Sequence, residues 1–461
     1  PVLAFRTVTY CTENEETPKG GFWSPERRKR QPTGREGRID ARRGETPQVA
    51  RCEARKPGPE RSAGRRPNFT EAEPDDAGQP HAAAEKYNVY GMKGYADDGY
   101  CSEGVGYYNY GFCAYILLRE EVYRATQGKI DFFQTPKFVR IARYGKKIQM
   151  NEGVCPAYSD CRMGLSPDKF ILSYCDRALG ITSAEEQPVL PKGNNLSLHL
   201  LELFTSQVAK VGMTDGIRQV LQEESDALRA YYEQAGILIA RPAGGTSCRL
   251  AISAKGGTNA ENHNHNDVGS YAVALGSETM VGDQGGPNSY PGDYFNGDAP
   301  QKYKIKGSFG HPVPVVDGRT QSSGGKAKGV VLQKEFTNEK DVFSIDYTSA
   351  YSTPNLDKLI RTFVYDRQGK GNFTVGDEFT AKTPIRFETA ITTRADWKIL
   401  DDTHLLLATD SEQMIVAIDA SGKVAFTSET IEVNSPAYTR IGIALKNQSK
   451  EGYIRLKMYT K

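Results

Sequence analysis

Apolar and polar residues alternate along the second half of the chain, as in the segment YAVAL at 271–275. A period of two is typical of strands, and turn residues such as Gly256-Gly257 separate many of these segments. We therefore expect strands at 237–241, 249–253, 270–275, 330–336, 342–347, 359–365, 413–418, 440–445 and 453–459. Many short strands separated by turns indicate an antiparallel β-sandwich.

The preceding part of the chain has helical periodicity instead. Residues 103–127 place Tyr107, Tyr110 and Leu117 on one face and end at Gly128, which suits the position after a helix. We expect further helices at 168–179, 196–211 and 216–234. Helices separated by loops rich in Gly, Pro, Asn and Ser indicate a helical domain with antiparallel neighbours.

The first 85 residues differ from the rest of the chain. Arginine-rich runs at 26–30, 41–43 and 64–67 stand among Pro, Gly and Glu, and apolar residues show no period there. This composition is typical of a disordered tail, and it also fits a corrupted gene start. The sequence therefore predicts an α+β multidomain chain, with an atypical basic segment at 1–85, a helical domain at 86–235 and a β-sandwich domain at 236–461.

Composition narrows the classes of partner. A net charge of +2 gives no argument for nucleic acid, and no apolar run reaches the length of a membrane span, about 18 residues. The N-terminus shows no signal peptide. The eight cysteines contain no C-x-x-C pair, so we expect neither a disulfide framework nor a thiolate zinc site. The 25 tyrosines suit sugar binding, because the ring stacks while the hydroxyl forms hydrogen bonds.

The block NHNHNDVGSY at 262–271 is the most informative part of the sequence, because the chain holds only six histidines. On an extended strand, His263 and His265 would point to the same face. Paired imidazoles can bind a metal, or divide into one ligand and one proton-transfer group. His265 with Asp283 and His311 is a donor set that suits zinc, although the wide spacing also allows three ordinary polar residues.

A second block, DGYCSEGVGYYNYG at 98–111, opens the expected helix at 103–127. The phenol of Tyr107 can donate a proton when nearby cations or carboxylates tune it. The alternative is that the tyrosines of this block pack inside a helical bundle.

Taken together, these blocks resemble the heparinase II/III-type polysaccharide lyases, in which an α/α toroid precedes a β-sandwich. The likeness rests on the histidine block, on GDQG at 282–285, on GHPVPVVDG at 310–318 and on the tyrosine block, and it covers about residues 90–461. It implies an incomplete α/α toroid followed by an antiparallel β-sandwich, and a carbon–oxygen lyase that acts on polysaccharides.

The resemblance also implies roles for single residues. Tyr107 would protonate the leaving glycosidic oxygen, and His263 would act as the base or as the partner of the substrate carboxylate. A mainly structural zinc ion would be held by His265, Asp283 and His311. The positions that bind substrate would be Glu103, Tyr110, Tyr290 and Tyr294.

The expected reaction is β-elimination in an acidic, uronic-acid-containing polysaccharide of the heparin/heparan or alginate class. Such a site must neutralise the uronate carboxylate, remove the C5 proton and protonate the C4 oxygen. The resemblance also implies the bacterial periplasm or exterior, and the sequence is compatible with a dimer.

The start of the chain departs from the family pattern. The family supplies an Asn or an Asn-His pair upstream of the tyrosine to neutralise the carboxylate, and the Arg/Pro/Gly-rich start contains no convincing match. Asn194-Asn195 comes too late in the order. We therefore expect a truncated or corrupted toroid and impaired activity.

Two other functions fit parts of the sequence. A cupin-like metal enzyme also uses a His-x-His pair, but it normally carries an acid a few residues later, where this chain has VGSY at 268–271. A non-catalytic polysaccharide-binding protein would use the tyrosines and the sandwich without the chemistry. Identifying the bound metal would distinguish a cupin-like enzyme from a lyase. Loss of cleavage in Tyr107→Phe would distinguish a lyase from a non-catalytic binding protein.

Overall fold

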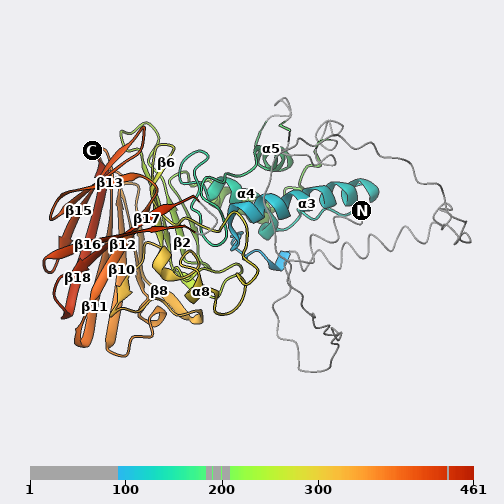
Figure 1. Ribbon diagram of the computed structural model, residues 1–461. Coiled ribbons are helices and arrows are strands. Elements are labelled where there is room, and N and C mark those ends of the chain that lie inside the picture. The colour runs from blue at the N-terminus through green and yellow to red at the C-terminus, as the bar shows by residue number, and fades with distance from the viewer. Residues whose placement is uncertain (1–91, 183–188, 191–198, 200–207, 433–435) are drawn as a thin grey trace, which may run out of the picture. The chain divides into compact units, whose positions relative to one another are not determined.

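The computed structural model describes residues 92–182, 189–190, 199, 208–432 and 436–461 (Figure 1). The segment 1–85, expected to be disordered or corrupted, lies outside these residues, and so does most of the expected helix at 196–211. No helix in the described ranges is long and apolar enough to cross a membrane.

The helices of the described residues are α3 (Gly104–Ala125), α4 (Pro136–Lys147), α5 (Lys169–Ala178), α7 (Asp215–Glu223) and the short α8 (Ala299–Lys302). α3 and α5 confirm two expected helices, whereas α4 was not predicted. The side chain of Thr135 accepts a hydrogen bond from the backbone of Phe138, and Pro136 occupies the first turn of α4. This pair is an ordinary start signal for a helix.

The expected helix at 216–234 is wrong in its second half. α7 ends at Glu223, and the strand β1 (Arg229–Tyr232) follows it. Ala230 and Tyr232 pack into the core beside the helices, while Tyr231 packs into the core between the sheets. Pairing as a strand lets both faces of this segment pack, and this outweighs its helical propensity.

A five-stranded antiparallel sheet separates the two cores, with the strand order β1-β2-β3-β5-β6. Besides β1, its strands are β2 (Ile237–Ala240), β3 (Leu250–Lys255), β5 (Tyr271–Leu275) and β6 (Glu278–Val281). Along β2, Ile237 and Ile239 pack with the helices, whereas Leu238 and Ala240 pack with the other sheets. Because both faces are covered, β2 is apolar throughout.

The larger sheet contains nine strands in the order β13-β14-β15-β18-β11-β10-β9-β8-β4 (Figure 1). Their bounds are β4 (Gly257–Asn259), β8 (Gly324–Phe336), β9 (Lys340–Asp346), β10 (Leu356–Asp366), β11 (Asn372–Ile385), β13 (Asp396–Asp401), β14 (His404–Ala408), β15 (Gln413–Ala420) and β18 (Ser449–Thr460). In β10, the inward positions Leu359, Arg361, Phe363 and Tyr365 alternate with less buried ones. This alternation produces the sequence period of two.

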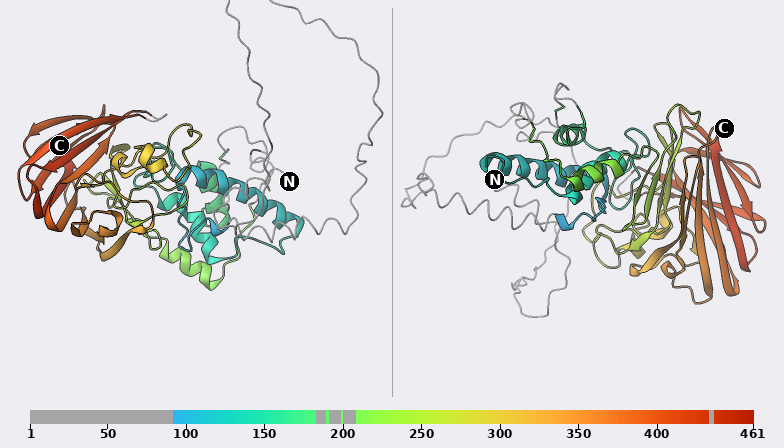
Figure 2. Two further views of the ribbon diagram at one scale, coloured as in Figure 1. Left: turned by 60° about the horizontal axis from the view of Figure 1, so that its bottom comes forward. Right: turned by 180° about the vertical axis from the view of Figure 1, so that it is seen from behind.

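A four-stranded sheet completes the β part, in the order β16-β17-β12-β7. Figure 2 shows the β part from two further sides. Its strands are β7 (Val315–Val316), β12 (Phe387–Thr393), β16 (Val424–Ile431) and β17 (Tyr438–Leu445). Ile391 and Ile443 of this sheet share one core with Leu250 of the five-stranded sheet and Phe363 of the nine-stranded sheet. The α+β fold with an antiparallel sandwich is therefore confirmed. The α/α toroid is not confirmed, and the domain boundary at 235/236 stays a prediction.

Candidate functional site

His263 and His265 lie in a loop, so the expectation that they occupy a strand is wrong. β4 ends at Asn259 and β5 begins at Tyr271. His263 has a positive φ of 51°, outside the range of an extended strand. The two imidazoles nevertheless converge, because both contact the carboxylate of Asp160. His263 Nδ1 lies 2.6 Å from Oδ2, and His265 Nε2 lies 3.0 Å from Oδ1.

Asp160 is the residue of this site that sequence reasoning missed. It lies in the loop before α5, its side chain is 0 % exposed, and the Tyr294 hydroxyl donates to it at 3.1 Å. Burial opposes the charge, but hydrogen bonds from His263 and His265 outweigh burial and hold the pKa of the Asp160 carboxyl below its usual range. Asp160 stands 103 residues before His263 and belongs to no motif, so only the folded chain reveals it.

Two glycines let the Asp160 loop approach its neighbours closely. A Cβ atom on Gly104 would lie 2.5 Å from Cys161 Cβ, and a Cβ atom on Gly285 would lie 1.6 Å from the Cys161 carbonyl oxygen. Both glycines also have positive φ values, 81° and 72°. The start of α3 and the GDQG segment therefore hold the residue next to Asp160 between them, at distances that no side chain would allow.

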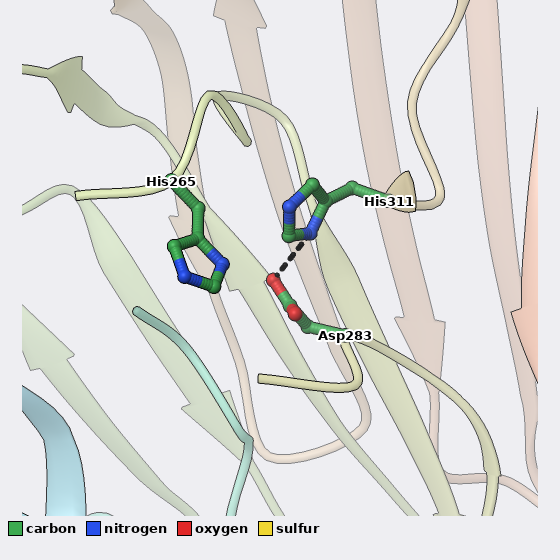
Figure 3. Close-up of side chains that lie close together, drawn as sticks. All are labelled: His265, Asp283 and His311. Atoms are coloured by element: carbon green, nitrogen blue, oxygen red, sulfur yellow. Dashed lines mark hydrogen bonds and ion pairs between the residues drawn. The ribbon is translucent and has the colours of Figure 1, made fainter. Parts of the chain in front are cut away.

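A buried group of His265, Asp283 and His311 could hold a metal ion, and Figure 3 shows the three side chains pointing toward one another. Their candidate ligand atoms lie within 4.8 Å of one another, and His311 Nδ1 is 2.8 Å from Asp283 Oδ2. Within the described ranges, His265 Nδ1 and His311 Nε2 are buried without a hydrogen-bond partner. Buried nitrogens in that state require an explanation, and a bound cation supplies one. Two imidazoles and a carboxylate are ordinary metal donors, so these residues fit a metal ion.

Arg361 of β10 holds both of the loops that carry the metal-site histidines. Its Nη1 donates to the carbonyl oxygens of Gly269 and Pro312, at 2.7 Å in each case. Its Nε and Nη2 form a two-bond pair with Asp377, at 2.7 and 2.6 Å. Both side chains are buried, so the paired charges compensate each other and the loops are tied to the rigid sheet.

A second buried ion pair supports the histidine loop. Lys255 Nζ lies 2.7 and 2.8 Å from the two carboxylate oxygens of Asp267, and both side chains are almost inaccessible. The side-chain amide of Gln321 donates to the Val268 carbonyl and accepts from the Val268 backbone N–H. The histidine loop contains no regular strand, so these buried bonds hold it in its conformation.

An aromatic edge faces solvent beside His263. The ring centroid of Tyr107 lies 4.5 Å from that of His263, and the Tyr107 hydroxyl lies 3.2 Å from the Tyr290 hydroxyl. Tyr290 is 40 % exposed and Phe295 is 57 % exposed. Glu103 Oε2 is 3.8 Å from His263 Nε2, and burial raises the pKa of the Glu103 carboxyl although His263 opposes the rise. A phenol, an imidazole and an acid therefore meet at an accessible edge.

The other two residues expected to bind substrate lie differently. Tyr110 is 65 % exposed on α3 and, in the described part of the chain, has none of the hydrogen bonds or ring contacts that join the aromatic edge. Tyr294 is 0 % exposed, and its hydroxyl lies 3.2 Å from His265 Nε2 in addition to its bond with Asp160. Tyr294 therefore supports the site from its buried side.

A hollow of about 490 Å³ opens beside the aromatic edge. Its lining includes Ser102 and Asn262, which are the chain neighbours of Glu103 and His263. Both signs of charge line it: Lys93 and Lys137 stand with Asp97 and Glu261, and Lys137 pairs with Asp97 at 2.9 Å. This volume is in the range of small-ligand sites, about 300–1,000 Å³.

No protein-family model and no curated protein sequence matches the chain. Solved structures do have a similar fold. Heparan sulfate lyase HepC from Pedobacter heparinus is 14 % identical with a TM-score of 0.59, and the match covers 84 % of this chain and 57 % of that one. Two heparinase III structures are 16 % and 12 % identical, with TM-scores of 0.53 and 0.56, and the matches cover 82 % and 86 % of this chain and 58 % and 60 % of theirs.

The chain thus spans 57 % to 60 % of the length of these structures. At such identities the likeness concerns the fold alone. This chain has the fold of heparinase-like polysaccharide lyases, as its motifs predict.

Proposed function

We propose that this chain is a polysaccharide lyase that cleaves a uronic-acid-containing polymer of the heparin/heparan or alginate class by β-elimination. The proposal is carried by the contact between Tyr107 and His263 at an exposed edge, beside a buried group of metal-binding type. The fold shared with heparan sulfate lyase HepC and heparinase III supports it.

The two residues suit the two proton transfers of the reaction. A base removes the C5 proton, the electron pair forms the C4–C5 double bond, the bond from C4 to oxygen breaks, and the leaving oxygen takes a proton. His263 Nδ1 is used by Asp160, so Nε2 is the nitrogen that can exchange a proton with substrate. In the proposal His263 takes the C5 proton and Tyr107 protonates the leaving oxygen. For the opposite C5 epimer, Tyr107 would do both and His263 would face the carboxylate.

The residues around this pair suit a sugar chain. Exposed rings such as Tyr110 and Tyr290 can stack on sugar faces. The adjoining hollow carries both signs of charge, because Asp97 and Glu261 line it together with Lys93 and Lys137. From the resemblance to heparinase II/III-type lyases, we also propose that the chain acts in the periplasm or outside the cell.

For the buried group we propose zinc, held by His265, Asp283 and His311. These side chains are 0–1 % exposed, so a polymer cannot reach them and the proposed role is structural. A bound zinc ion would supply a fixed positive charge that unites three chain segments. With the ion bound, His265, Asp283 and His311 would hold their chain segments in place and so keep His263 next to Tyr107.

The test compares carboxylated polymers with matched polymers whose uronate carboxyls have been reduced. The full chain is incubated with heparan sulfate and alginate and with their carboxyl-reduced forms. We expect the ultraviolet absorbance of an unsaturated uronate from a carboxylated polymer only, because the carboxylate is what makes the C5 proton removable. New reducing ends without this absorbance would indicate hydrolysis and reject the proposal. Binding without cleavage would favour a non-catalytic binding protein, and bound redox-active iron would favour the cupin-like enzyme.

A further inference from the structure

Asp160 belongs neither to the Tyr107–His263 pair nor to the buried metal group, yet it contacts a member of each. Its Oδ2 lies 2.6 Å from His263 Nδ1, and its Oδ1 lies 3.0 Å from His265 Nε2. We propose that Asp160 is a positioning residue whose single carboxylate orients both imidazole rings and so links the metal group to the substrate-facing edge. The part of this proposal that concerns turnover rests on the proposed function.

The bond to His265 determines which ring nitrogen faces the metal group. An ionised carboxylate only accepts hydrogen bonds, so His265 Nε2 must carry the hydrogen. In a neutral imidazole the lone pair then lies on Nδ1, which is buried and has no hydrogen-bond partner among the described residues. Figure 3 shows the ring beside Asp283 and His311. Orientation of a ligand histidine by a carboxylate behind it is a recurring feature of metal sites.

The bond to His263 has the corresponding effect at the exposed edge. A hydrogen on His263 Nδ1 donates to Asp160, so the lone pair of the neutral ring lies on Nε2. Nε2 is the nitrogen near Glu103, and the ring lies against Tyr107. The same carboxylate therefore selects the tautomer of both histidines, although the two rings serve different purposes.

The surroundings hold Asp160 in this place. Its neighbour Ser159 has a positive φ of 58°, which is uncommon for a residue with a side chain, and the Ser159 hydroxyl donates to the Ser102 carbonyl at 2.8 Å. The neighbour on the other side, Cys161, lies between two glycines, with its Cβ against Gly104 and its carbonyl oxygen against Gly285. A third donor, the Tyr294 hydroxyl, completes the bonds to the carboxylate. Such a constrained backbone indicates that the position of this carboxylate is specified by the fold.

The metal half of the proposal is tested with Asp160→Asn, which keeps the side-chain size but cannot accept two imidazole N–H groups in the same way. Zinc affinity is measured by competition with a chromophoric chelator, using the full chain. We expect a loss of about 10- to 100-fold, the usual effect of removing such a partner. Asp176→Asn is the matched control, because Asp176 is a buried carboxylate on α5 that pairs with Arg143 and Lys146 away from the site. Affinity unchanged in Asp160→Asn, or lowered equally in the control, overturns this half.

The His263 half is tested by a double-mutant cycle and by NMR. Asp160→Asn should lower kcat by about 10-fold or more with little change in KM, and should add no further loss in a His263→Gln background. Additive losses would show that Asp160 does not act through His263.

The N–H proton of His263 bound to a carboxylate should give a far-downfield NMR signal that Asp160→Asn removes, and persistence of that signal also overturns this half. Absent turnover of every uronate polymer would reject the proposed function, while zinc competition and the NMR signal would still decide the role of Asp160.

Discussion

The buried metal group and the exposed aromatic edge share one carboxylate but differ in their physical character. His265, Asp283 and His311 are 0–1 % exposed, and the loops that carry the two histidines are tied to the sheet by the fully buried Arg361. The aromatic edge includes Tyr290 and Phe295, which are 40 % and 57 % exposed and are joined mainly by ring contacts.

This difference predicts that substitutions in the two regions have different effects. Removing one partner from a buried polar group leaves another polar group or charge uncompensated, which costs stability. Exposed rings can exchange contacts with solvent for contacts with a ligand at little cost to the fold. We therefore expect changes in the buried group to act on stability, and changes at the edge to act on turnover.

The largest effect is expected at the exposed edge. Tyr107→Phe removes the proposed proton donor, so cleavage should fall about 10²- to 10⁴-fold. The free energy of unfolding should change by less than about 1 kcal/mol, because the ring remains. Kinetics and thermal unfolding check the two parts. Tyr123→Phe makes the same change further along α3, about 24 Å away along the helix axis, and should preserve cleavage. A large loss of stability in Tyr107→Phe would contradict the separation of the two regions.

The next effect concerns the support of the metal group. Arg361→Met leaves Asp377 buried without its partner and releases the carbonyls of Gly269 and Pro312. Stability should fall by about 3–5 kcal/mol in denaturant unfolding. Arg455→Met is the control, since the exposed pair of Arg455 with Glu378 should contribute about 0–1 kcal/mol. Equal effects of the two variants would show that the buried pair has no special role.

Removal of the metal should have a somewhat smaller effect on stability. If zinc is present at 100 to 1,000 times its Kd, a chelator should lower the free energy of unfolding by about 3–4 kcal/mol. Calorimetry with and without chelator measures the difference. His311→Ala should no longer respond to the chelator, because one of the metal donors is gone. A wild-type chain that shows no response would reject the metal site.

The smallest effect is expected for a neighbour of the proposed acid. Tyr290→Phe removes the hydroxyl that lies 3.2 Å from the Tyr107 hydroxyl but keeps the ring. Loss of one such hydrogen bond corresponds to about 1 kcal/mol, or roughly fivefold in kcat. Steady-state kinetics measure it, and the melting temperature should stay unchanged. A loss as large as that of Tyr107→Phe would instead place Tyr290 among the groups that transfer protons.

Local patterns predicted those elements whose packing leaves a periodic signal. The alternation at 271–275 became β5, and the expected strand at 359–365 lies inside β10. β11 (Asn372–Ile385) and β12 (Phe387–Thr393) were not predicted. β11 contains alternating buried positions, whereas β12 is buried at nearly every position and so has little period of two. The segment of β1 was assigned to a helix, because its pairing with β2 is a tertiary contact that no local period records.

The candidate site was likewise predicted only in part. The sequence grouped His265, Asp283 and His311 by donor type, and the structure brings them together. It placed His263 beside His265 on a strand face, whereas both side chains lie in a loop and converge through Asp160.

By itself, the sequence determined the α+β class, the order of helices before strands, and the side chains able to perform the chemistry, because periodicity and residue type are local properties. Only the tertiary structure decided which of these side chains is buried, which faces solvent, and that Asp160 stands between them. The physical reason is that a carboxylate acquires this role from three donors distant in the chain, His263, His265 and Tyr294, and from the exclusion of water around it. Neither the three distant donors nor the burial of Asp160 can be inferred from the residues next to it in the sequence.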